Sequence, residues 1–214
     1  MEKMYTTRIL ERRIKWGNNM NYDKGHERFI NTILEIANQI IKNSKTINTT
    51  HVLKLIDLIN QVNSNDGTIF VYGAGRSGFI GRCFAQRLMH LGVNSCFVSD
   101  AITRRYNKED LLILISGSGE TTSPVAIARK AKEIGGKIAL LTNNPESTTG
   151  KISNVVIKIE GKRKDVAVSQ KTLAPYTTLF DISALTVLDS IGAALMELLG
   201  VTEKDIDKRH ASIE

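Results

Sequence analysis

The spacing of hydrophobic residues changes character near residue 68. Before that point, apolar residues recur at helical spacing in two segments, as Phe29, Ile33, Ile36 and Ile40 and then as Val52, Leu55, Ile56 and Ile59. After it, short continuous apolar runs alternate with helical patterns, as expected when helices cover both faces of a parallel sheet. Residues 1–22 show only weak periodicity and many polar residues. We therefore expect a poorly structured or artefactual N-terminal arm over 1–22 and a single domain over 23–214.

The alternating part predicts five strands and their intervening helices. The expected strands are 68–72, 94–98, 110–115, 137–142 and 155–160. The expected helices are 77–91, 121–134, a short piece before the last strand, 179–199 and 203–210, with a long connection over 161–178. This order is typical of an α/β fold, a doubly wound, mainly parallel five-stranded sheet with helical additions at both ends.

Two loops of small residues follow two of these strands. The run Thr68–Tyr72 leads into Gly73-Ala-Gly-Arg-Ser-Gly78, and the run Leu111–Ile115 leads into Ser116-Gly-Ser-Gly-Glu-Thr121. Each loop precedes a predicted helix, whose N-terminus offers unpaired N–H groups and the positive end of a dipole. Small residues let a phosphate approach those groups. The two loops together predict a pair of backbone cradles for one anionic ligand.

Side chains in both loops add candidate phosphate ligands. Ser116, Ser118 and Thr121 provide three hydroxyls in the second loop, and a phosphate needs several such converging donors. In the first loop we expect Gly75, Arg76 and Ser77 to contribute, with Arg76 the best candidate cation and Arg87 an alternative. The competing interpretation of the second loop is a Ser/Thr-rich helix N-cap without a ligand.

The first loop also permits a dinucleotide site. Gly73, Gly75 and Gly78 match the G-x-G-x-x-G fingerprint between a strand and a helix, and Asp100 follows the next strand. Three features count against it: anion-binding side chains inside the loop, the second cradle, and a chain short for a cofactor domain plus a separate substrate domain. We therefore favour a phosphorylated small molecule over a dinucleotide as the ligand.

Charge and composition restrict the remaining classes. The net charge is +7, with seven Lys/Arg against four acids in residues 1–28, but no basic stripe with interleaved aromatic residues follows. No segment reaches about 20 uninterrupted apolar residues, and the start lacks an apolar signal core. His26 and His51 have no ligand partners at metal spacing. We expect a cytoplasmic protein without nucleic acid, membrane or metal.

Four motifs, in order, carry a resemblance to a known family. The second loop looks like the phosphate loop of sugar-isomerase (SIS) domains. The resemblance to the 6-phospho-3-hexuloisomerases rests on Gly73-Ala-Gly-Arg-Ser-Gly-Phe-Ile-Gly-Arg82, Phe84-Ala-Gln-Arg-Leu-Met-His-Leu-Gly92, Asp110-Leu-Leu-Ile-Leu-Ile-Ser-Gly-Ser-Gly-Glu-Thr121 and Lys208-Arg-His-Ala-Ser-Ile-Glu214. It spans about residues 29–214.

The resemblance implies an SIS domain of flavodoxin-like type and a specific reaction. Such enzymes interconvert D-arabino-hex-3-ulose 6-phosphate and D-fructose 6-phosphate through an enediol, in the formaldehyde-fixing ribulose monophosphate route or its reverse. They use no metal or organic cofactor. It further implies a homotetramer and functional coupling to a hexulose-6-phosphate synthase.

The resemblance also assigns the proton-transfer residues. Asp181, in Thr177-Thr-Leu-Phe-Asp181, stands where these isomerases usually carry a catalytic Glu. The preceding Ala174-Pro-Tyr-Thr177 also departs from the usual Pro-Met-Gly-Thr. His210, in the family-like tail, is the second candidate for proton transfer. In such assemblies a tail residue can complete the site of a neighbouring subunit. The plainer alternatives are a dipole-favoured acid at a helix N-terminus for Asp181 and a solvated helix-end residue for His210.

Two functional alternatives remain open at this stage. One keeps the fold and changes the sugar, giving an aldose–ketose phosphate isomerase. The other is a non-catalytic sugar-phosphate-binding SIS module that acts as a sensor. The altered segment from Ala174 to Asp181 is the feature that keeps both alternatives open.

Overall fold

A parallel five-stranded sheet forms the centre of the molecule. The computed structural model describes residues 22–162 and 172–213. The strands are β1 (Ile69–Gly73), β2 (Ser95–Phe97), β3 (Leu111–Ile115), β4 (Lys137–Thr142) and β5 (Val155–Lys158), in the order β2-β1-β3-β4-β5. All four neighbouring pairs are parallel. The predicted doubly wound sheet is thus confirmed, with strand ends displaced by at most two residues.

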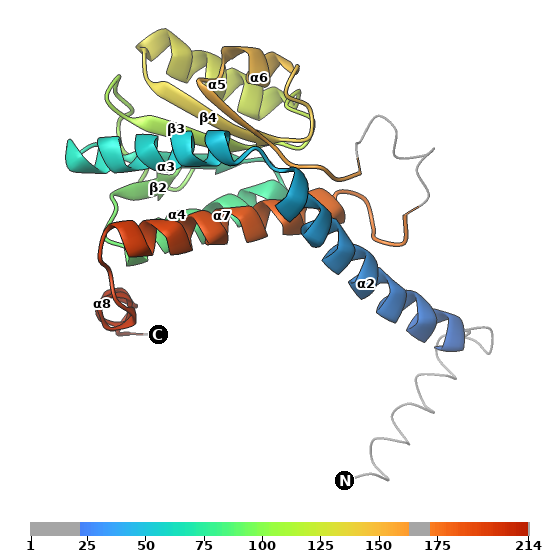
Figure 1. The fold of residues 1–214 in the computed structure, drawn as a ribbon. Helices are drawn as coiled ribbons and strands as arrows, with labels where there is room; N and C mark the ends of the chain where they lie inside the picture. Colours follow the sequence, from blue (N-terminus) through green and yellow to red (C-terminus); the bar gives the residue numbers. More distant parts are fainter. Residues whose placement is uncertain (1–21, 163–171, 214) are drawn as a thin grey trace.

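Helices cover both faces of this sheet (Figure 1). One face carries α3 (Thr49–Ser64), α4 (Arg76–His90) and α7 (Thr178–Leu198), and the other carries α5 (Thr122–Ile134) and α6 (Thr148–Ile152). The strand β3 is buried along its whole length. Its residues 111, 113 and 115 join one core cluster, whereas residues 112 and 114 join the other. A continuous apolar run is what such two-sided burial requires.

The helical additions lie at opposite ends of the molecule. Helix α2 (Tyr22–Thr46) projects from the body, and the short α8 (Glu203–Arg209) packs near the ends of α4 and α7 that lie farthest from α2 (Figure 1). The helical pattern predicted over 29–40 therefore extends in both directions. Apart from Tyr22, which begins α2, the predicted arm 1–22 lies outside the described residues.

Sequence signals account for the ends of α3. The Asn48 side chain caps its N-terminus by accepting a hydrogen bond from the backbone N–H of His51. At the other end, Asp66 adopts a positive φ of 56° and the chain turns into β1.

Helix α7 is the most apolar long helix in the described part of the chain. By length and composition alone it could cross a membrane, but half of its most apolar window is buried inside the protein. Its buried residues Ala184, Leu188 and Leu195 belong to the core cluster shared with α3 and α4. The apolar character of α7 is thus explained by packing.

The sheet has a single point at which its direction of growth reverses. From β1 the chain adds β2 on one side, and from β3 it adds β4 and β5 on the other. The last residues of β1 and β3, Gly73 and Ile115, are paired in register. Ligands of open α/β sheets bind beyond the carboxyl ends of strands at such a switch point, and both small-residue loops begin there.

Candidate active site

The two predicted loops line one pocket at the switch point. Its volume is about 300 Å³, and it is bounded by the two loops and by the start of α7. Gly75 and Ser77 come from the loop after β1, whereas Ser116, Ser118 and Thr121 come from the loop after β3. The structure therefore brings together six of the eight predicted site residues, since Asp181 joins these five from α7.

Backbone geometry explains the glycines of the first loop. Gly75 has φ +56° and serves as the N-cap of α4, a conformation that L side chains rarely adopt. A Cβ on Gly73 would lie 2.5 Å from the carbonyl oxygen of Ser77. This close approach returns the chain tightly from β1 into α4, whose N-terminus then faces the pocket.

The second loop presents its hydroxyls in two different ways. Ser116 is buried, and its Oγ accepts a hydrogen bond from the backbone N–H of Gly119. The Oγ atom of Ser118 lies 3.4 Å from Oγ1 of Thr121. Thr121 is the N-cap of α5, yet its side chain makes no capping hydrogen bond. The hydroxyls of Ser118 and Thr121 are thus paired with each other at the start of a helix, where an anion is favoured.

Asp181 connects the first loop to α7. It is 2% exposed, and its carboxylate accepts three side-chain hydrogen bonds. Oδ2 accepts from Nε of Arg76 at 2.9 Å and from the Oγ1 hydroxyl of Thr177 at 2.7 Å. Oδ1 accepts from the Oγ hydroxyl of Ser77 at 3.1 Å. A buried carboxylate requires such partners because burial without them is costly.

Arg76 occupies a different position from the one the sequence favoured. Its guanidinium is paired with Asp181, the side chain is 62% exposed, and it does not line the pocket. The alternative, Arg87, pairs with Asp189 near the middle of α7. Among the described residues, the cation that lines the pocket is Lys162, whose Nζ donates to Oγ1 of Thr172 at 3.0 Å.

Sequence reasoning missed four polar pocket residues, Asn143, Lys162, Tyr176 and Thr177. Asn143 follows β4, and its Nδ2 donates to the carbonyl of Gly161, next to Lys162. The position of Asn143 at the carboxyl end of a parallel strand is a signal that could have identified it. Lys162 and Tyr176 lie in the connection between β5 and α7, where local sequence carries no such signal.

Glu120 connects the second loop to α6. Its Oε1 accepts a hydrogen bond of 2.6 Å from the backbone N–H of Thr148, the first residue of α6. This hydrogen bond lowers the pKa of Glu120 below its ordinary value. The carboxylate therefore stabilises the second loop against the N-terminus of α6.

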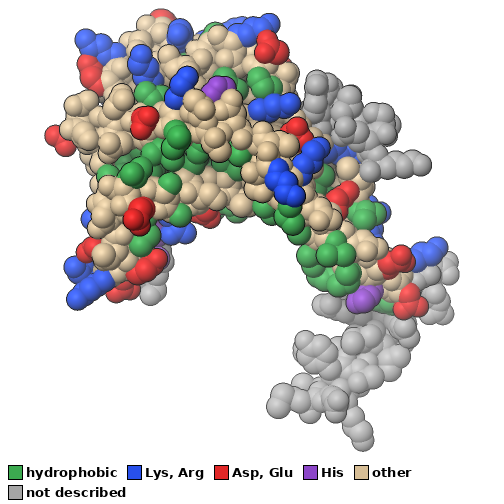
Figure 2. All heavy atoms as spheres, in the orientation of Figure 1, with side chains coloured by type: hydrophobic (Ala, Val, Ile, Leu, Met, Phe, Trp, Pro, Cys, Tyr) green, Lys and Arg blue, Asp and Glu red, His purple; other side chains and the backbone are tan. Residues whose placement is uncertain are grey.

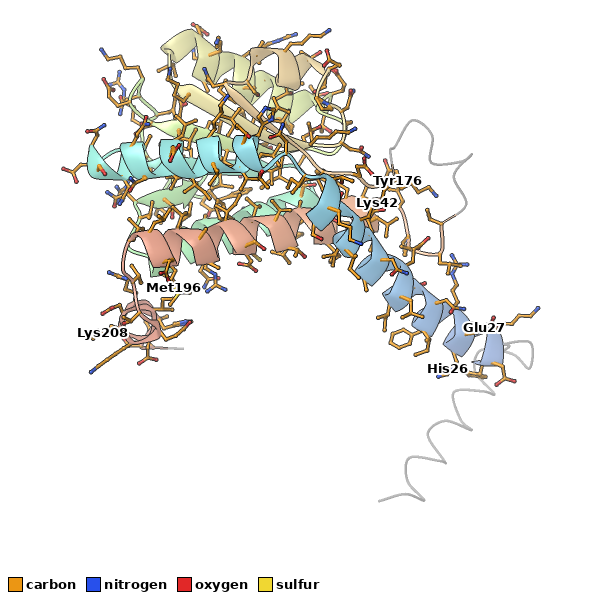
Figure 3. All side chains as sticks on the ribbon, in the orientation of Figure 1. His26, Glu27, Lys42, Tyr176, Met196 and Lys208 are labelled. Atoms are coloured by element: carbon orange, nitrogen blue, oxygen red, sulfur yellow. The ribbon has the colours of Figure 1, made fainter. Side chains whose placement is uncertain are left out.

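His210 lies far from the pocket within one chain. Its ring stacks on that of His90 at a centroid distance of 4.2 Å. His90 is the last residue of α4, whereas the pocket lies at the start of that helix. Fifteen helical residues span about 22 Å. Figure 3 shows the same separation: Tyr176 lies where α2 joins the body, and Met196 and Lys208 lie at the other end. A role for His210 in proton transfer remains a prediction that requires a second copy of the chain.

Metal ligands do not cluster in the described part of the chain. No group of three or more His, Cys, Asp or Glu residues there is arranged to hold a metal ion. The polar side chains that line the pocket carry hydroxyls, the Asn143 amide, one carboxylate and one ammonium group.

Comparison with known proteins identifies the family. The SIS domain family matches residues 63–186. A Bacillus subtilis protein named 3-hexulose-6-phosphate isomerase is 38% identical over 183 residues, covering 85% of this chain and 97% of the relative. A Methanocaldococcus jannaschii protein of the same name is 42% identical over 145 residues, covering 68% of this chain and 76% of the relative.

A solved structure agrees with these relatives. The crystal structure of a Methanococcus jannaschii protein, described as inferring a 3-hexulose-6-phosphate isomerase function, superposes with a TM-score of 0.71. It is 38% identical in sequence, and the match covers 84% of this chain and 97% of that one. With the paired loops at its switch point, the chain belongs to the SIS domain family and is a phosphosugar isomerase.

Proposed function

We propose that the chain interconverts D-arabino-hex-3-ulose 6-phosphate and D-fructose 6-phosphate. The observation that carries this proposal is the arrangement of one pocket. Two phosphate-type loops and the buried carboxylate of Asp181 line the same 300 Å³ space. The relatives named 3-hexulose-6-phosphate isomerase support the choice of sugar.

The phosphate belongs at the second loop in this proposal. The hydroxyls of Ser118 and Thr121 and the first N–H groups of α5 converge there. The buried Ser116 hydroxyl fixes the loop through Gly119. In the first loop, Gly75 lets the backbone approach the substrate, while Ser77 and Arg76 hold Asp181 in place.

Asp181 is the proposed base. The reaction requires removal of the proton from C2 of the 3-ketose, formation of an enediolate across C2 and C3, transfer of the O2 hydroxyl proton to O3, and return of the carbon-bound proton to C3, which leaves the carbonyl at C2. A pocket carboxylate held by three donors has a fixed position for both transfers. Lys162 is the proposed cation that stabilises the developing enediolate oxygen. We propose that His210 assists from a neighbouring copy.

The shorter acid is compatible with this role if its surroundings have shifted to match. Asp181 stands where the hexuloisomerases usually carry Glu. Because its side chain is one methylene shorter, its carboxylate lies farther from the substrate, and a misplacement of about 1 Å can cost around a hundredfold in rate. Tyr176, Thr177 and Lys162 are the pocket residues from the connection before α7. Their placement can compensate for the missing methylene.

Assembly and cellular context complete the proposal. We propose a homo-oligomer, a tetramer, in the cytoplasm, acting with a hexulose-6-phosphate synthase in the formaldehyde-linked ribulose monophosphate pathway. Figure 2 shows hydrophobic side chains gathered on the projecting helix α2. Phe29, Ile33 and Leu34 are each at least half exposed there, which supports association between copies.

One assay tests the proposed reaction. D-arabino-hex-3-ulose 6-phosphate is generated in place from ribulose 5-phosphate and formaldehyde by a hexulose-phosphate synthase, and fructose 6-phosphate is followed. We expect rapid formation that depends on the protein. If no product forms, binding and solvent-deuterium exchange with fructose 6-phosphate separate the alternatives. Binding without exchange indicates a sensor, and deuterium that enters C1 but not C3 of fructose 6-phosphate indicates an aldose–ketose isomerase.

A further inference from the structure

Helix α2 holds both ends of the connection that borders the pocket. At the beginning of this connection, Asn43 pairs with the backbone of Glu160: its Oδ1 accepts from the N–H at 3.0 Å and its Nδ2 donates to the carbonyl at 2.9 Å. Gln39 donates to the same carbonyl at 3.2 Å, and Lys42 forms an ion pair with the Glu160 side chain. Asn43 is 4% exposed, so this attachment belongs to the body of the protein.

Glu35 holds the other end of the connection. Its Oε2 accepts hydrogen bonds from the backbone N–H groups of Leu173 at 3.0 Å and Ala174 at 2.6 Å. Its Oε1 lies 3.1 Å from the same N–H of Leu173. About two turns earlier on α2, Arg28 donates a hydrogen bond from Nη2 to the carbonyl of Leu173 at 2.7 Å. Charged partners make these hydrogen bonds stronger than neutral ones.

The residues held by Glu35 lead directly into the pocket. Ala174 is 3% exposed, and after Pro175 come the pocket residues Tyr176 and Thr177. Thr177 has a positive φ of 69° and donates its hydroxyl to Asp181. A β-branched residue in this conformation is strained unless its surroundings enforce it. The attachment at Leu173 and Ala174 is three residues away from that strained position.

We propose that Glu35 is a positioning residue of the isomerase. It fixes the backbone at Leu173 and Ala174, so that Tyr176 and Thr177 reach the pocket and Thr177 can orient Asp181. Helix α2, which projects from the body, thereby becomes part of the machinery that sets the geometry of the site. The effect on turnover rests on the proposed function, whereas the attachment itself does not.

The test compares three substitutions on α2. Glu35→Ala removes the acceptor. Glu35→Gln keeps one oxygen, which suffices because Oε2 accepts from both N–H groups. Glu27→Ala removes an exposed acid eight residues earlier on the same helix, near the far end of α2 (Figure 3). Two properties are measured in the full chain, the steady-state kinetics and the hydrogen exchange of the Leu173 and Ala174 amides by NMR.

For Glu35→Ala we expect those two amides to exchange at least about tenfold faster while the β3 amides stay protected. We expect kcat to fall roughly 10- to 100-fold, the size of a 1 Å misplacement. KM should stay within about threefold because the loop 116–121 is untouched. Glu35→Gln should restore most of both properties, and Glu27→Ala should match the wild type.

Other outcomes separate the two parts of the inference. Unchanged exchange at Leu173 and Ala174 in Glu35→Ala would overturn the attachment. Faster exchange with unchanged kcat would overturn the positioning role, and so would an equal loss of kcat in Glu27→Ala. A wild-type protein inactive on the hexulose phosphate would overturn the proposed function, and the exchange data would still decide the attachment.

Discussion

The two loops at the switch point are both rich in small residues, but different contacts stabilise them. The loop after β1 depends on a distant partner, since Arg76 and Ser77 bind Asp181, 105 and 104 residues away. The loop after β3 has hydrogen bonds of its own, from the Gly119 N–H to Ser116 and from the Glu120 N–H to Ser118. It is also held by the two elements that follow it in sequence, since the Thr142 hydroxyl at the end of β4 and the Thr149 hydroxyl of α6 donate to its carbonyl groups. The second loop is therefore held by itself and by elements within about 30 residues of it, whereas the first is completed only by α7, more than 100 residues away.

The largest expected effect comes from removing the distant partner of the first loop. In Asp181→Asn the amide cannot serve as a base, so we expect kcat to fall about 10³-fold or more, within the usual contribution of general acid–base catalysis. Fructose 6-phosphate should still bind with an affinity within about threefold of the wild type. Isothermal titration and the coupled assay measure the two quantities. Turnover retained in Asp181→Asn would remove this residue from the mechanism.

Asp181→Glu is the matched variant for that experiment. It restores the acid usual in the hexuloisomerases and keeps the charge opposite Arg76. If the surroundings of the pocket are adapted to the shorter acid, this variant should retain measurable turnover but lie below the wild type. A rate above the wild type would show that no such adaptation exists.

Replacing one glycine of each loop by alanine compares how much each position contributes to the stability of the protein. A Cβ on Gly119 would lie 2.0 Å from Oγ of Ser147, and φ is +66°, whereas a Cβ on Gly75 meets nothing within 4 Å at φ +56°. We expect Gly75→Ala to lower the free energy of unfolding by about 1 kcal/mol through backbone strain alone. Gly119→Ala should lower it by about 2–4 kcal/mol. Urea denaturation measures both, and equal losses would contradict the steric argument.

Hydroxyl removal tests which loop binds the phosphate. Thr121→Val keeps the shape and deletes a hydroxyl that makes no capping bond. The affinity for fructose 6-phosphate should fall about 10-fold, the value of one hydrogen bond to a charged group. Ser77→Ala is the comparison, because its hydroxyl is bound to Asp181, and it should reduce kcat more than affinity. The reverse pattern would assign the phosphate to the first loop.

The smallest expected effect concerns the far end of α4. Burial, His210 and Arg87 lower the pKa of His90 below its ordinary value of 6.5. The unfolded chain therefore binds this proton at a higher pH than the folded chain. The free energy of unfolding should fall as the pH drops below about 6.5, until the folded-state pKa is passed. When the pH is lowered from 7.5 to 5.5, the free energy of unfolding should fall less in His90→Gln than in the wild type, with a difference of up to about 1 kcal/mol. An identical pH dependence would contradict this account.

Local sequence determined the elements and the place of the pocket. Apolar periodicity predicted the five strands and the helices between them, because burial on one or both faces acts on residues close in the chain. Small residues after β1 and β3 predicted two cradles, and parallel pairing brings such strand ends to one edge. Asp181 was found through a family motif, and the structure places it in the pocket.

Contacts between distant segments were decided by tertiary structure alone. Arg76 was expected to face the ligand, but packing of α4 against α7 places Asp181 within its reach, and the guanidinium binds that buried charge. Lys162 reaches the pocket from the connection before α7. Glu35 on α2 holds Leu173 in the same connection, although the two residues are more than a hundred positions apart in the sequence. His210 lies at the opposite end of α4 because α8 packs there and its C-cap residue His210 stacks on His90. The sequence by itself determined the fold and the two small-residue loops, since periodicity and turn chemistry are local. Only the three-dimensional packing decided which charges meet in the site.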